Sequence, residues 1–197
     1  MSPILQGLAN GSARGYGAFV PLGAAGAFES IASASGTGSS ATITFSSIPS
    51  TYQHLQFRIL GQNTRTPALS SVNIKVYFNG VNSGTGYAYH QLKGDGSTAT
   101  AAGFASQPEM LIFSPIPSSG YGNTMGVSII DIQDYASTSR NKTIRALSGY
   151  DGNGAGEIML TSGFRASTDA ITSVSFLLDA FNWTTTTTIA LYGIKGA

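Results

Sequence analysis

The stretch His54-Leu55-Gln56-Phe57-Arg58-Ile59-Leu60 decides the fold class of this chain. Its apolar residues alternate with polar ones, so Leu55, Phe57 and Ile59 share one face of an extended strand, and His54, Gln56 and Arg58 lie on the other. A period of two is the signature of a β-strand that is buried on one side only.

The same alternation recurs along most of the chain. Residues 72–78 repeat it and are followed by Asn79-Gly80, which is a strong turn signal. Segments rich in Gly, Asn, Asp and Ser separate the candidate strands, because these residues favour turns. Further strands are expected at residues 28–34, 41–46, 86–92, 109–113, 124–133, 141–148, 157–165, 171–178 and 187–195. No amphipathic helix is expected, and residues 134–139 form at most one short turn. The pattern predicts an all-β, antiparallel, jelly-roll-like sandwich.

The composition limits the chemistry of the chain. Its 197 residues are 10% charged, with a net charge of +1, two histidines and no cysteine. This balance does not favour a polyanion such as DNA, and it leaves little electrostatic repulsion between copies, which favours self-association. The lack of cysteine excludes disulfides, a thiolate zinc site and a cysteine nucleophile. Because no long apolar run and no secretory signal is evident, we expect neither membrane insertion nor Sec export.

Residues 1–27 differ from the rest and are expected to form an N-terminal attachment arm, with residues 28–197 as the sandwich domain. The arm is rich in glycine, which breaks regular elements, yet it also carries large apolar residues that a solvated linker does not need. We expect the arm to dock on a neighbouring subunit, with packing on its own domain as the alternative. The residues assigned to this assembly role are Ile4, Leu5, Leu8, Arg14, Tyr16 and Phe19.

Candidate catalytic groups are few, and we expect no enzyme activity. His54 and His90 are the only imidazoles, and each could meet Asp131 or Asp134 in space. The two aspartates are three residues apart, which places them on opposite faces of a strand, so a turn or capping role is expected instead of paired-acid catalysis.

One turn carries the beginning of a calcium-loop pattern. Asp151-Gly152-Asn153-Gly154 alternates oxygen-bearing side chains with glycine, but the twelfth position of such a loop needs an acid and here is Ser162. A plain β-turn is expected, with no metal and no cofactor.

Aromatic side chains are the remaining candidates for ligand binding. Aromatic rings on a polar β-scaffold can stack on sugar rings, while neighbouring amides bind hydroxyls. Tyrosine is equally common at protein interfaces. The candidate glycan contacts are Tyr77, Tyr121, Tyr135, Tyr150 and Trp183.

Several stretches together resemble a group of small β-sandwich virion proteins of tailed phages of aquatic bacteria, which are commonly described as tail-fibre or virion structural proteins. The stretches that carry the resemblance are residues 6–17, Phe28-Glu29-Ser30-Ile31-Ala32, residues 43–55, Phe78-Asn79-Gly80, Gly86-Tyr87-Ala88-Tyr89-His90 and Leu191-Tyr192-Gly193-Ile194-Lys195.

The resemblance spans nearly the whole chain and implies a virion location, with assembly in the host bacterial cytoplasm. From the labels that such proteins usually carry, we expect a tail-fibre or tail-associated subunit attached through its arm, and from the aromatic residues we expect host-surface glycan binding by the sandwich. The alternative is a head decoration protein that reinforces the capsid. The expected partners are other copies of the chain, as a homotrimer, and other tail or capsid proteins, with no nucleic acid.

Overall fold

The structure is a computed structural model that describes residues 27–66 and 71–196. It is nearly all β, with 57% of residues in strands and 2% in helix. The strands are β1 (Phe28–Ser35), β2 (Thr42–Phe45), β3 (His54–Gly61), β4 (Ser71–Phe78), β5 (Tyr87–Gly94), β6 (Ala99–Gln107), β7 (Met110–Pro117), β8 (Gly126–Gln133), β9 (Lys142–Asp151), β10 (Gly156–Arg165), β11 (Val174–Leu178) and β12 (Thr188–Ile194). One 3₁₀ turn, η1 (Ser119–Tyr121), precedes β8. The described residues contain no helix of the length and hydrophobicity that a bilayer crossing requires.

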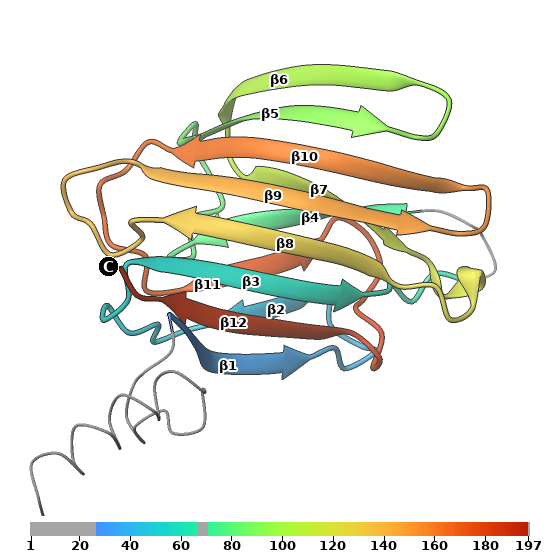
Figure 1. Ribbon diagram of the computed structural model, residues 1–197, viewed down its shortest axis with the longest axis horizontal. Coiled ribbons are helices and arrows are strands. Elements are labelled where there is room, and N and C mark those ends of the chain that lie inside the picture. Colours follow the sequence, from blue (N-terminus) through green and yellow to red (C-terminus); the bar gives the residue numbers. More distant parts are fainter. Residues whose placement is uncertain (1–26, 67–70, 197) are drawn as a thin grey trace, which may run out of the picture.

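The strands form two antiparallel sheets that pack as a sandwich (Figure 1). The larger sheet has eight strands in the order β1-β12-β3-β8-β9-β10-β5-β6, and the smaller has four in the order β2-β11-β4-β7. The expected β-sandwich is therefore confirmed, whereas its jelly-roll connectivity stays a prediction. Because the larger sheet has twice as many strands, the hairpin of β5 and β6 projects at one end of the molecule (Figure 1).

The core lies between the sheets and follows the alternation read from the sequence. In β3, Leu55, Phe57 and Ile59 are buried, while Arg58 is exposed on the other face. Phe57 makes edge-to-face contacts with Phe45 and with Phe176, which belong to the smaller sheet, at centroid distances of 5.4 and 4.9 Å. Such aromatic pairs add about 0.5–1.5 kcal/mol beyond their area burial.

Eleven of the strands lie where the sequence places them, with ends that shift by a few residues. The Asn79-Gly80 turn is also confirmed, since both residues have positive φ, 53° and 70°, as a type I′ turn requires. The expected turn over residues 134–139 is present as well. The strand that the sequence misses is β6, whose residues ATAAGFASQ show no alternation. The expected arm, apart from Ala27, lies outside the described residues.

Candidate interaction surface

The outward face of the eight-stranded sheet, here the outer face, carries a row of apolar side chains that crosses four strands. Direct cross-strand pairing sets Ile129 of β8 beside Leu147 of β9, Leu147 beside Leu160 of β10, and Leu160 beside Leu92 of β5. Side chains that are opposite on neighbouring strands lie about 4.5–5.5 Å apart. The four side chains therefore form a continuous apolar row at right angles to the strands.

A second row runs parallel to the first, two residues along each strand. It joins Leu60 of β3 to Val127, then Gly149, Ile158 and Gly94. The seven large side chains of the two rows are 42–61% exposed, although each belongs to a regular strand. We call this set the apolar band: Leu60, Leu92, Val127, Ile129, Leu147, Ile158 and Leu160.

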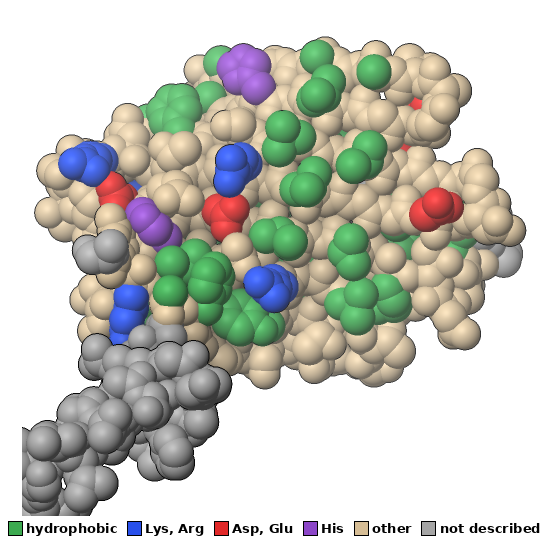
Figure 2. Space-filling model, in the orientation of Figure 1, with side chains coloured by type: hydrophobic (Ala, Val, Ile, Leu, Met, Phe, Trp, Pro, Cys, Tyr) green, Lys and Arg blue, Asp and Glu red, His purple; other side chains and the backbone are tan. Residues whose placement is uncertain are grey.

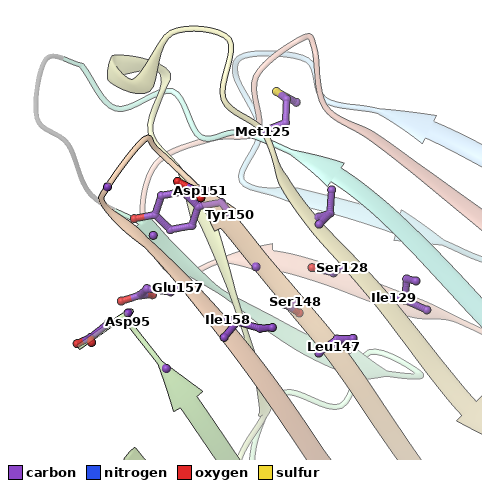
Figure 3. Close-up of a pocket in the computed structure, with 16 residues that line it drawn as sticks. Asp95, Met125, Ser128, Ile129, Leu147, Ser148, Tyr150, Asp151, Glu157 and Ile158 are labelled. Atoms are coloured by element: carbon purple, nitrogen blue, oxygen red, sulfur yellow. The ribbon is translucent and has the colours of Figure 1, made fainter. Parts of the chain in front are cut away.

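The apolar band lies on the side of the molecule that Figure 2 presents, where hydrophobic side chains cross the sheet. Part of the band borders a hollow of about 740 Å³. Figure 3 shows Ile129, Leu147 and Ile158 on neighbouring strands around this hollow, with Asp95 and Glu157 at its margin. The hollow therefore has an apolar floor and a charged margin.

A polar row borders the band on the other side. Gln56, Asp131 and Arg145 are neighbours on β3, β8 and β9. Gln56 Nε2 donates to Asp131 Oδ1 over 2.9 Å, and Arg145 Nη2 lies 3.6 Å from Asp131 Oδ2. Arg58 Nε donates to Gln56 Oε1, and its guanidinium lies 5.3 Å from the centre of the Tyr192 ring. Asp131 offsets the charge of Arg145, and Arg58 contacts only neutral groups, so the row carries a small net positive charge.

The outer face has the dimensions of a protein interface. Eight strands about 4.8 Å apart, each seven to ten residues long at ~3.3 Å per residue, cover roughly 1,000 Å². A standard interface covers about 800 Å² on each partner. Contiguous exposed apolar patches on soluble proteins mark binding or assembly sites, so the outer face is the candidate functional surface of the described chain.

The histidine and aspartate candidates have structural contacts. Asp134 lies in the turn after β8 with a φ of 47°, and its backbone N–H donates to His54 Nδ1 over 3.0 Å. Its carboxylate pairs with Arg140 Nη1 at 2.6 Å. Asp131 belongs to the polar row, and His90 lies on the exposed side of β5 with its ring against Gly103. The expected turn role of Asp134 thus has a direct counterpart in the structure.

The Asp151 turn joins β9 to β10 as an ordinary hairpin connection. Asp151 Oδ1 accepts the N–H of Asn153 over 2.8 Å, and Asn153 and Gly154 both have positive φ. Over residues 27–66 and 71–196, no cluster of three or more His, Cys, Asp or Glu side chains is placed to hold a metal ion.

The five aromatic candidates for glycan contact do not form one surface. Tyr135 and Trp183 are 0% exposed and belong to the core, and Tyr77 is 9% exposed, so none of the three rings has enough free surface to stack on a sugar. For these three residues the sequence-based assignment is wrong, because aromatic residue type does not distinguish a core position from a surface position.

Tyr121 and Tyr150 are partly exposed and do lie together, with ring centroids 5.5 Å apart in an edge-to-face contact. Tyr150 also lines the hollow beside the apolar band. A glycan contact at this pair stays a prediction. The assembly residues assigned to the arm lie outside the described residues.

The apolar band itself was missed by the sequence reading. A signal for it exists in runs that are apolar on both faces of a strand, such as Ile158-Met159-Leu160, where Met159 is buried and its two neighbours are exposed. Such runs are also typical of strands buried on both sides, so the sheet order is needed to recognise an uncovered face.

Comparison with known proteins gave no matching family model, no matching curated protein and no matching solved structure.

Proposed function

We propose that this chain is a non-enzymatic structural subunit of a phage virion that self-associates through the outer face of its eight-stranded sheet. The observation that carries the proposal is the apolar band, in which seven large aliphatic side chains are exposed on adjacent regular strands. The resemblance of residues 6–17, 43–55 and 191–195 to virion proteins of tailed phages supports the virion as the place of assembly.

A second copy of the chain is the occupant that the outer face fits best. The face covers an area close to that of one side of a standard interface. In its polar row Asp131 and Arg145 neutralise each other, which leaves Arg58 as the one remaining cation, so two copies that meet here oppose few like charges. The net charge of +1 adds little long-range repulsion.

Face-to-face packing of two copies would form an isologous contact in which each apolar band is covered by its mate. Stacked sheets pack about 10 Å apart, which excludes water from the band. Burying a partly exposed Leu, Ile or Val contributes up to about 1.5–3 kcal/mol for each side chain. Seven such side chains on each copy make this the main source of affinity. The homotrimer expected for a tail-fibre subunit is the alternative stoichiometry.

A labelling experiment tests the virion part of the proposal. Purified particles from lysates of the phage that encodes the chain would be treated with gold-tagged antibody raised against residues 28–197 and viewed by electron microscopy. Label at the tail is expected, in line with the tail-associated role implied by the resemblance. Label spread over the head would support the head decoration role instead, and particles without label would contradict a virion function.

A further inference from the structure

The last strand of the eight-stranded sheet, β6, has an unusually open edge. Residues Ala99 to Gly103 are all exposed, so both faces of this part of the strand meet solvent. No strand of the described chain pairs with β6 on the side away from β5. Every second residue of an edge strand directs its N–H and C=O away from its partner, so this edge offers a row of hydrogen-bonding groups.

The other edges of the sandwich carry features that discourage strand pairing. β1 has a bulge between Ser30 and Ala32, and it carries Glu29, which is bound by Tyr52 and Lys195. β2 has only four residues, and β7 ends in Pro117, which lacks an N–H. Short strands, charges, bulges and prolines are the means by which proteins protect sheet edges.

β6 lacks most of these protections. Its sequence, ATAAGFASQ, contains no charged residue and no proline. Its irregularity is confined to the far end, where Ser106 has a φ of 56° and the Ala105 carbonyl accepts Gln107 Nε2. The regular part, residues 99–104, is held flat against β5 by Phe104, whose ring stacks on Tyr89 at 4.8 Å. Over residues 99–103 no side chain is larger than threonine, so the edge is open to pairing along this length.

We propose that the β6 edge is a second self-association site, at which β6 of one copy pairs antiparallel with β6 of another. A second copy is the fitting partner because the strand is uncharged, so self-pairing opposes no like charges, and because its Ala and Gly side chains are small enough to lie opposite themselves. The inference rests on the proposed structural role and adds to it. One isologous interface closes a dimer, whereas two on one chain extend the assembly.

The geometry of the pairing follows from symmetry. A twofold axis that relates two antiparallel strands of one sheet stands perpendicular to that sheet, so the outer faces of both copies point the same way. The apolar bands of the pair then lie side by side and form a surface of twice the width. Pairing within residues 99–104 places the twofold axis at Ala101, which pairs residues 99–103, or at Ala102, which pairs residues 100–104, and the residue at the axis lies opposite its own copy.

Cysteine crosslinking tests this geometry, because the natural chain contains no cysteine. The full chain would carry one cysteine at a time, as Ala99→Cys, Thr100→Cys, Ala101→Cys or Ala102→Cys, with Ser33→Cys on β1 as the matched edge control. Gly103 is left unchanged, since a Cβ there would lie 2.8 Å from the His90 ring. A disulfide needs Cα atoms about 4.4–6.8 Å apart, so only the residue at the axis can join its own copy.

After oxidation with a copper catalyst, non-reducing gels are expected to show a band at twice the 20.3 kDa chain mass. Its yield should be highest for Ala101→Cys or Ala102→Cys, at least fivefold lower two residues away, and negligible for Ser33→Cys. Equal yields at all positions, or none on β6, would overturn the proposal.

Repeating the cysteine crosslinking in a Leu147→Asp/Leu160→Asp variant distinguishes association through the β6 edge from association through the outer face. Crosslinking that persists there supports an edge contact independent of the apolar band. Crosslinking lost in that background would show that β6 pairs only as a consequence of face packing, which overturns the edge site and leaves the proposed function standing.

Discussion

At the scale of single residues, Lys142 is the polar side chain that the fold depends on most clearly. It is 1% exposed, and its Nζ donates to the carbonyls of Ser137, Arg140 and Thr168. Burial lowers the pKa of this ammonium group from its usual value, and nearby Asp169 acts in the opposite direction. Lys142 therefore ties the β8–β9 connection to the loop that follows β10.

Lys142→Met is expected to destabilise the protein by about 2–3 kcal/mol, because three carbonyl groups lose hydrogen bonds from a charged donor. The matched control is Arg140→Met, which removes a largely exposed cation from the same loop and should cost no more than about 1 kcal/mol. Urea unfolding followed by circular dichroism measures both. Equal midpoints for the two variants would contradict this role of Lys142.

At the scale of elements, the hairpin of β5 and β6 depends on one capped turn. Asp95 Oδ1 accepts the backbone N–H groups of Ser97 and Thr98 at 2.9 and 2.7 Å, and the Ser97 hydroxyl at 2.9 Å. These hydrogen bonds lower the pKa of Asp95 to about 2, and the two from backbone N–H groups have the largest effect. The carboxylate form is thus the one that holds the turn.

Asp95→Ala is expected to speed amide hydrogen exchange in β5 and β6 several-fold while leaving β3 and β12 unchanged, because the turn loses three hydrogen bonds and the hairpin edge frays.

A lowered pKa means that the capping contribution is complete above pH 3.8 and disappears as the pH falls through about 2.

Asp169→Ala, in the turn where Ser167 Oγ donates to Asp169, serves as the control and should not affect β5 or β6. Mass spectrometry of peptides after hydrogen exchange measures the exchange rates of both variants. Unchanged exchange in the hairpin of Asp95→Ala would contradict the capping role.

Most elements were predictable from the sequence because one-sided burial leaves a period of two, as in β3 and β4. β6 was not, since Ala-Thr-Ala-Ala-Gly has no apolar face to read. It is a strand because β5 lies beside it and Asp95 turns the chain, which are effects of tertiary context on weak local propensity. The same lack of pattern is what leaves its edge open.

The candidate surface was harder to predict than the fold. The sequence predicted glycan contact for Trp183 and Tyr135, although both are fully buried. It did not predict an interaction surface at Leu147 and Ile158, although both are exposed. An apolar residue in a strand is buried only if another element packs on the face to which it points, so residue type alone does not predict burial. Which face is covered depends on the order of strands in the two sheets, and that order is not evident from local patterns.

At the scale of the whole molecule, the two sheets differ in size and in the surface they present. The four-stranded sheet covers most of one face of the eight-stranded sheet, apart from β6, and the opposite face is left with the apolar band. A fold that served only as a monomer would place polar residues there, as antiparallel sheets with one solvated face do. The exposed aliphatic side chains therefore point to a second protein surface that covers them.

The measurement that tests this claim most directly is sedimentation equilibrium of the wild-type chain and of Leu147→Asp/Leu160→Asp. The two aspartates would lie directly opposite each other on β9 and β10, so the double substitution is expected to destabilise the fold by about 1–2 kcal/mol, and circular dichroism checks that the fold is kept. A matched pair of substitutions at exposed loop positions, Ser83→Asp/Thr85→Asp, controls for added charge.

We predict that the wild type and the loop control sediment as oligomers, and that the apolar-band variant associates at least tenfold more weakly than either. A wild-type chain that stays at 20.3 kDa at all concentrations, or an apolar-band variant that associates as strongly as the loop control, would contradict the account.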